Sequence, residues 1–309
     1  DRSMAKIKAL TQGEWLPEPL TQQEIRQLGT RLSLEWEAWK LKACDIIIVA
    51  VPTDIDEHNV PNLEPLLRAG EMLNKTMPKD RPWGLCIEST VWPGCTEEVV
   101  IPLLSYHRDR EGFFYGYSPE RIVPGAPLGK HHGEGQGLHN TNKLVSGSCP
   151  DALEIFRVIY SDVVTEAKVV ACPSVKVAEA SKMLENIQRD VNIALINEYA
   201  QGCSALGIQI HEVLEAAGTK WNFHPYKPGL VGGHCIGVDP YYMLYRTAQE
   251  GVELPLIRQA RETNQAAPRE LAARVVKDLL RRKCELRVLV VGATFKENCD
   301  DLRNSKVLD

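Results

Sequence analysis

Two continuous apolar runs dominate the first third of the chain. Cys44–Asp54 reads CDIIIVAVPTD and Trp83–Thr90 reads WGLCIEST, and each run ends in polar residues. Runs without polar alternation are typical of parallel strands buried on both faces. Between them, NLEPLLRAGEMLNKTM has apolar residues at helical spacing. The pattern predicts a βαβ unit of a doubly wound α/β domain.

The polar tips of these strands are candidate ligand contacts. Ligands of doubly wound sheets lie beyond the carboxyl ends of the strands. Loop starts and helix caps explain the same residue types equally well. The tips are Thr53, Asp54, Glu88, Ser89 and Thr90.

A long helix is predicted over Ser174–Leu206. The segment contains no proline, and its first glycine is Gly202. About 30 residues make a helix of roughly 45 Å, long enough to connect two domains or to form a dimer surface. An apolar stripe is expected at Ala180, Leu184, Ile187, Val191 and Leu195.

The face opposite this stripe carries Lys182, Asn186 and Arg189. Residues three and four apart share one side of a helix. By spacing alone, a solvated face is the simpler interpretation of these three polar residues.

Near the end of the chain, Leu286–Val291 predicts a further apolar strand, followed by a glycine. It resembles the first strand of a second α/β domain. A strand without a surrounding sheet would leave an open edge, so we expect the chain to be a fragment of a longer protein. A G-x-G-x-x-G motif is absent from the first hundred residues, and Asp1 is a candidate for the acidic residue that follows such a loop.

Composition narrows the function class. The chain has 309 residues, a net charge of −5 and 44% hydrophobic residues, without a basic block or an apolar run of membrane-spanning length. These features argue against nucleic-acid or membrane binding. The nine cysteines are odd in number and lack metal-ligand spacing, so we expect neither a disulfide framework nor a metal site, and we favour the cytoplasm.

The segment GLVGGHCIGVDPYY, Gly229–Tyr242, raises a chemical question. It places Cys235 among glycines that permit close backbone approach, with Asp239 four residues later. A reactive nucleophile and a buried cysteine in a tight turn both fit this pattern. His234 is a poor partner for Cys235, because adjacent side chains on an extended chain point in opposite directions.

Five motifs in order resemble the UDP-glucose/GDP-mannose dehydrogenase family. They are STVWPG, SPER, AEASKMLENIQRDVNIALINE, GGHCIGVDPYY and GATFKENCDDLRNS. The histidine before the cysteine and the VDPYY after it resemble the branch acting on UDP-N-acetylhexosamines. Gly237 and Val238 stand where the glucose-oxidising branch has Pro-Lys, which disfavours UDP-glucose as substrate.

The resemblance implies NAD-dependent four-electron oxidation of C6 of a UDP-sugar to the uronic acid. Cys235 would form a thiohemiacetal and then a thioester. Lys182 would stabilise the oxyanion, and Asn186 would share this role or hold a water. Asp239 would help to activate the hydrolytic water, and Glu120 and Thr90 would order that water or act in the first proton transfer.

The resemblance also implies binding contacts and partners. NAD contacts are expected at Asp1, Thr53, Thr90 and Arg303. Substrate contacts are expected at Glu120, Arg121, Lys182, Asn186, Gly232 and Lys296. The expected partners are a UDP-sugar and a second copy of the chain, which would dimerise through the long helix.

Three domains are expected: a Rossmann-like NAD-binding domain over 1–167, a central helical domain over 168–280, and the start of a second Rossmann-like, UDP-sugar-binding domain over 281–309. Two other functions remain open from the sequence. One is a non-catalytic dimerising remnant, and the other is a two-electron hydroxyacid-type dehydrogenase, which needs no cysteine.

Overall fold

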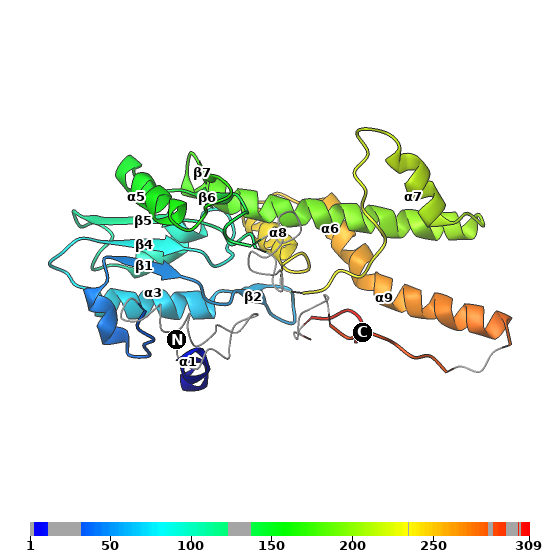
Figure 1. The fold of residues 1–309 in the computed structure, drawn as a ribbon, viewed down its shortest axis with the longest axis horizontal. Coiled ribbons are helices and arrows are strands. Elements are labelled where there is room, and N and C mark those ends of the chain that lie inside the picture. The colour runs from blue at the N-terminus through cyan, green and yellow to red at the C-terminus, as the bar shows by residue number, and fades with distance from the viewer. Residues whose placement is uncertain are drawn as a thin grey trace. The chain divides into compact units, whose positions relative to one another are not determined.

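The computed structural model describes residues 3–11, 32–122, 137–233, 235–283, 287–294, 302 and 304–309. The chain forms two compact units (Figure 1). Unit 1 comprises Asp1–Thr53 and Leu63–Ala180, and unit 2 comprises Asp54–Asn62 and Ser181–Asp309.

Unit 1 is built on a parallel sheet. The strands β1 (Ile46–Val49), β4 (Trp83–Ile87) and β5 (Phe113–Tyr117) lie in the order β1-β4-β5. Both pairings are parallel, and every residue of β4 is buried. The helix α3 (Glu64–Thr76) connects β1 to β4 and buries Leu66 and Leu73. The predicted βαβ unit is therefore confirmed.

A second pair of parallel strands, β6 (Lys143–Val145) and β7 (Val169–Ala171), continues this unit. The backbone N–H of Ser146 donates to the carbonyl of Tyr117 at 3.0 Å, which links the end of β6 to β5. The helix α5 (Pro150–Ser161) packs Phe156 and Tyr160 into a core with Cys86 and Val145. Figure 1 shows α3 on one face of the sheet and α5 on the other. Cys86 is thus a packing residue of this core.

Short helical segments complete unit 1. They are α1 (Met4–Thr11), η2 (Ala38–Ala43), η3 (Thr96–Val100) and α4 (Ile101–Leu103).

The helix α6 (Val175–Ala205) has 31 residues, so the predicted long helix is confirmed. Its buried positions recur at 175, 178–179, 182–183, 186–187, 190, 194, 200 and 203, as expected for one helical face. The predicted apolar stripe is wrong at Leu184 and Leu195, which are 65% and 59% exposed. The buried face instead carries several polar side chains, and each has a partner or charged neighbour that makes burial possible.

Unit 2 is helical. It contains α7 (Ile210–Gly218), α8 (Asp239–Gln249) and α9 (Pro255–Arg281), together with the two-residue antiparallel strands β2 (Asp54–Ile55) and β3 (Pro61–Asn62). The buried Tyr242 of α8 donates its hydroxyl to the carbonyl of Asp54 at 3.2 Å. This bond attaches the short hairpin to α8.

The strand predicted at Leu286–Val291 does not form over the described part of this segment, residues 287–291. Val288, Leu289, Val290 and Val291 are 58–87% exposed. No described residue pairs with them in a ladder, and an isolated strand lacks the hydrogen bonds that define it. Among the described residues, no helix is long and apolar enough to cross a membrane.

Candidate active site

Three buried polar side chains and an exposed thiol form the centre of unit 2. Lys182 and Asn186 lie one turn apart on α6 and are 7% and 4% exposed. The Asn186 amide donates to Oδ2 of Asp239 at 2.5 Å. The backbone N–H of Asp239, at the start of α8, donates to the carbonyl of Cys235 at 2.9 Å. The first residue of α8 is therefore bonded to the backbone of Cys235, which is an exposed residue.

Burial controls the charge of Asp239. Its side chain is almost fully buried, and burial raises the pKa of its carboxyl to about 6, although the Lys182 ammonium and the Asn186 hydrogen bond each lower it. A carboxylate with this pKa is ionised at neutral pH and is a stronger base than an ordinary aspartate. The cluster therefore combines a cation and a base, and it is joined to the backbone of Cys235.

Backbone geometry and close packing explain why glycines flank Cys235. Gly233 has a φ of +76°, a conformation that favours glycine. Its N–H donates to the carbonyl of Asn304, and the Asn304 amide returns a bond of 2.8 Å to the Gly233 carbonyl. A Cβ on Gly237 would lie 3.3 Å from that same amide. The positive φ at Gly233 and the close approach of Asn304 to Gly237 thus favour glycine on both sides of the cysteine.

A chain of polar side chains, buried at Asp190, Arg261 and Asn264, anchors the start of the cysteine loop. Asn197 of α6 both donates to and accepts from the backbone of Gly229, at 2.9 Å each. Asn264 of α9 accepts from Asn197 at 3.0 Å and donates to the Asp190 carboxylate at 2.8 Å. Arg261 forms an ion pair of 2.6 Å with Asp190. The four side chains fix Gly229 against the α6–α9 pair.

The remaining predicted contacts of the described chain belong to unit 1, at the carboxyl ends of its parallel strands. Thr53 follows β1, Thr90 follows β4, and Glu120 and Arg121 follow β5. The hydroxyl of Ser89 accepts from the N–H of Val51 and donates to its carbonyl, at 2.8 Å each. The loops after β1 and β4 are therefore cross-linked.

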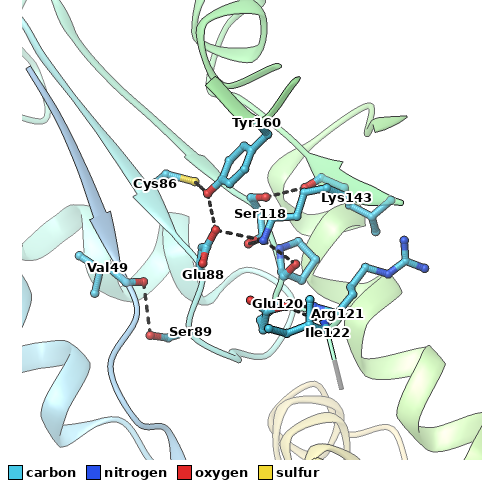
Figure 2. Close-up of polar contacts among 12 residues, drawn as sticks. Val49, Cys86, Glu88, Ser89, Ser118, Glu120, Arg121, Ile122, Lys143 and Tyr160 are labelled. Carbon is cyan, nitrogen blue, oxygen red and sulfur yellow. Dashed lines mark hydrogen bonds and ion pairs between the residues drawn. The ribbon is translucent and has the colours of Figure 1, made fainter. Parts of the chain in front are cut away.

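In the SPER motif, the Glu120 side chain is hydrogen-bonded to the backbone that directly follows it. Oε1 of Glu120 accepts from the backbone N–H groups of Arg121 and Ile122 at 2.6 Å each. The Arg121 guanidinium donates to the carbonyl of Asn142 at 2.6 Å. Figure 2 shows these residues beside Lys143, Glu88 and Tyr160, which form a buried polar cluster.

The predicted residues thus fall into two described groups. Unit 2 brings together Lys182, Asn186, Asp239 and the backbone of Cys235, with Gly232 half-buried in the same loop. The unit 1 group consists of Thr53, Thr90, Glu120 and Arg121. Arg189 is exposed. Asp1, His234, Lys296 and Arg303 lie outside the described residues.

Several structurally important residues were missed from the sequence: Lys143, Glu179, Asp190, Asn197, Arg261 and Asn264. Glu179 accepts from the N–H groups of Gly94 and Thr96, at 2.5 and 2.9 Å, just after the STVWP segment. Glu179, Asp190 and Asn197 share the helical spacing of Lys182 and Asn186, so periodicity of the polar residues would have found them. The other three carry no local signal.

The carboxyl edge of the parallel sheet fits part of a dinucleotide site. Thr53 and Thr90 are half-buried there, and their hydroxyls have no hydrogen-bond partner among the described residues. Free hydroxyls at this edge suit a ligand rich in hydroxyl and phosphate groups.

Comparison with known proteins decides the family. The chain matches the NAD binding domain of the UDP-glucose/GDP-mannose dehydrogenase family over residues 1–164, and the central domain of the same family over residues 176–266. The chain belongs to this family. Its cofactor is NAD.

Relatives in the family match along the whole chain. UDP-N-acetyl-D-glucosamine 6-dehydrogenase of Pseudomonas aeruginosa is 43% identical over 315 aligned positions, which cover 100% of this chain and 72% of that protein. Protein CapL of Staphylococcus aureus is 45% identical, with 100% and 71% covered. The solved UDP-D-ManNAc dehydrogenase of Pyrococcus horikoshii superposes with a TM-score of 0.84 at 28% identity, over 100% of this chain and 72% of that one. The α/β class with a Rossmann-like first domain and a helical central domain is confirmed, and the chain is an oxidoreductase of the nucleotide-sugar dehydrogenase type.

Proposed function

We propose that this protein oxidises C6 of a UDP-N-acetylhexosamine to the uronic acid, with two NAD consumed per sugar. The observation that carries the proposal is the unit 2 cluster. Lys182, Asn186 and Asp239 are all buried, and Asn186 donates to the Asp239 carboxylate. The backbone N–H of Asp239 donates to the carbonyl of Cys235, an exposed residue. The N-acetylhexosamine specificity rests on the names of the relatives from Pseudomonas aeruginosa and Pyrococcus horikoshii.

When bound, NAD would accept the hydride that is removed from C6 in each of the two oxidations. Thr53 and Thr90 are the described residues that would hold it, through hydroxyls at the carboxyl edge of the sheet. Asp1 and Arg303 complete the proposed contacts.

Cys235 works between the two oxidations. Loss of one hydride and one proton converts the C6 alcohol to an aldehyde. The Cys235 thiolate adds to the aldehyde carbon and forms a C–S bond, and the oxygen takes a proton to give a thiohemiacetal. Loss of the second hydride and of the hydroxyl proton gives a thioester. Water then adds to the thioester carbon, and cleavage of the C–S bond releases the acid and the thiol.

The buried cluster has distinct tasks in this sequence. The Lys182 ammonium stabilises negative charge on the C6 oxygen in the tetrahedral states, because a fixed cation in a dry site costs no reorganisation. Asp239, ionised at neutral pH, accepts a proton from the attacking water. Asn186 orients that carboxylate through the bond of 2.5 Å.

The unit 1 residues have a proposed role in substrate contact. Glu120 and Thr90 order the hydrolytic water or accept the first proton, and Arg121 contacts the substrate. Gly232 and Lys296 complete the proposed substrate contacts.

We further propose that the protein acts in the cytoplasm as a homodimer through α6. The support is the exposed apolar surface of this helix, where Leu184, Leu195 and Tyr199 are 56–65% exposed. Apolar side chains gathered on one surface are typical of protein interfaces.

The decisive test is stoichiometry. Incubation with UDP-N-acetylglucosamine or UDP-N-acetylmannosamine and excess NAD is expected to give two NADH per uronic acid, without free aldehyde. One NADH per sugar with an accumulating aldehyde would refute the covalent pathway and favour a two-electron dehydrogenase. Absence of NADH with every UDP-hexosamine would favour a dimerising remnant.

A further inference from the structure

A buried lysine joins two of the loops that carry proposed site residues. Lys143, the first residue of β6, is 2% exposed. Its ammonium donates to the carbonyls of Pro119 and Ser118, at 3.1 and 3.4 Å, and forms an ion pair of 3.0 Å with Glu88. Figure 2 shows the Lys143 side chain reaching toward Glu88 and Ser118. One cation therefore spans the loop after β4 and the loop after β5.

The carboxylate partner is itself held in place. The Tyr160 hydroxyl donates to Oε1 of Glu88 at 2.5 Å, and the Cys86 thiol lies 3.6 Å from that hydroxyl. The ammonium also lies 4.9 Å from the centre of the Tyr160 ring. Because the tyrosine proton is used toward Glu88, the thiol is the donor to the tyrosine oxygen. Burial raises the pKa of both Cys86 and Tyr160, so both remain neutral and the charge balance is between Lys143 and Glu88.

The third loop is joined through Ser89, which follows Glu88 directly. Its hydroxyl makes both bonds to the backbone of Val51, in the loop that leads to Thr53. Hydrogen bonds therefore connect the three loops that carry Thr53, Thr90 and Glu120. Lys143 connects the third of these loops to the other two, through its contacts with Pro119 and Glu88.

The energetics of this arrangement favour a positional role. A buried ion pair contributes little stability compared with apolar side chains of the same volume. A buried ammonium group is, however, costly unless its N–H donors have acceptors. The acceptors of Lys143 must therefore stay at hydrogen-bonding distance from it. The Pro119 carbonyl directly precedes Glu120, so the position of the ammonium fixes where the Glu120 backbone begins.

We propose that Lys143 is a positioning residue for the oxidation, holding Glu120 and Thr90 at a fixed separation through its contacts with Pro119 and Glu88. This inference rests on the proposed function, in which Glu120 and Thr90 act on the substrate. Lys143 itself does not touch the reacting atoms.

The test uses the Lys143→Met/Glu88→Gln double variant of the full-length protein. It removes both charges together, so neither is left buried alone, and Tyr160 can still donate to the new amide oxygen. Lys168→Met is the matched control, because Lys168 is an exposed lysine just before β7 whose carbonyl accepts from the N–H of Lys143.

Two readouts separate positioning from general stability. Hydrogen–deuterium exchange reports on the amides of Arg121 and Ile122, which are bonded to Glu120. Steady-state kinetics with a UDP-N-acetylhexosamine report kcat and KM. We expect faster exchange at these two amides, unchanged exchange in β4, and kcat and kcat/KM lowered together by on the order of 10²-fold, as for a misplaced site group. The control should match the parent in both measurements.

The inference would be overturned if the folded double variant had the same amide exchange rates at Arg121 and Ile122 as the parent, or the same kcat. If the double variant does not fold, Lys143→Gln/Glu88→Gln replaces it. In this variant the amide introduced at position 143 can still donate to the carbonyls of Ser118 and Pro119. The same two measurements, amide exchange and kcat, then decide whether the inference holds. If the parent oxidises no UDP-hexosamine, the proposed function fails, whereas the exchange measurement still decides whether Lys143 fixes the loop.

Discussion

The buried ion pair between Asp190 and Arg261 offers a quantitative test of how α6 and α9 are held together. The Asp190 carboxylate is fully buried and the Arg261 side chain is 3% exposed. Arg261→Met keeps most of the apolar stem but removes the guanidinium. Among the described residues, the carboxylate then retains only the Asn264 amide, at 2.8 Å.

The expected cost follows from this burial. Removing one partner of a buried pair leaves an uncompensated charge and costs about 3–5 kcal/mol of unfolding free energy. Arg258→Met on the same helix is the matched control. Arg258 pairs with Glu253 at the surface, where the side chains are 51% and 72% exposed, and such pairs contribute about 0–1 kcal/mol.

The loss should also depend on pH. Burial raises the pKa of Asp190, and Arg261 and Asn264 oppose this effect. Without Arg261 the folded-state pKa rises further above the unfolded value. Between the two values the folded state binds a proton that the unfolded state does not, so stability falls as pH rises through this window. The deficit of Arg261→Met is therefore expected to be larger at pH 8 than at pH 5.

Urea unfolding followed by circular dichroism at 222 nm measures these differences, because α6 and α9, with 31 and 27 residues, contribute strongly to the helical signal. Asp190→Asn/Arg261→Met removes both charges and should recover most of the loss. If Arg261→Met destabilises no more than Arg258→Met, or if its deficit does not change with pH, the reasoning from the buried charge is wrong.

Three further predictions concern the proposed reaction, and a fourth concerns the proposed dimer. Cys235→Ser should abolish uronic acid formation yet bind the UDP-sugar within about tenfold of the parent by calorimetry, since serine is a much weaker nucleophile of similar size; full conversion to the acid would contradict a covalent pathway. Lys182→Ala should lower NADH formation on the order of 10²–10³-fold, and a loss below tenfold would remove its oxyanion role. Because Asp239 has a pKa of about 6 and must be ionised to act as a base, kcat should fall as pH falls through that value, and the step should disappear in Asp239→Asn; a step retained in that variant belongs to another group. Leu195→Glu on the exposed face of α6 should give a monomer in sedimentation at micromolar concentration, and a dimer that persists would place the interface elsewhere.

The sequence predicted those elements whose pattern is local. The parallel strands β1 and β4 are continuous apolar runs and α6 is a long segment with helical spacing, so length and spacing were sufficient; the expected burial on both faces holds for β4 but not for β1, where Ile48 is exposed. Lys182, Asn186 and Asp239 were found through motifs, and the structure places them in one cluster. Spacing alone had favoured a solvated face for Lys182 and Asn186, because it does not show what a polar face packs against.

The parts that could not be predicted depend on long-range partners. Lys143 lies 55 residues from Glu88, and Arg261 lies 71 residues from Asp190. A lone lysine before an apolar strand and an arginine in a charged helix have no pattern that predicts burial. The same limitation explains the wrong strand at Leu286–Val291, where the apolar run was correct but a strand also requires a neighbour for its hydrogen bonds.

Each unit uses a buried ion pair beside a loop that carries proposed site residues. In unit 1, Lys143 and Glu88 hold the backbone before Glu120. In unit 2, the pair of Asp190 and Arg261 orients Asn264, and through it the start of the cysteine loop. Such pairs add little stability compared with an apolar core, so stability alone does not account for them. Apolar side chains could fill either site in several ways, whereas a charge with fixed donors accepts one geometry. Since a displacement of about 1 Å can cost two orders of magnitude in rate, we infer that both pairs serve the precision of the loops more than the stability of the fold.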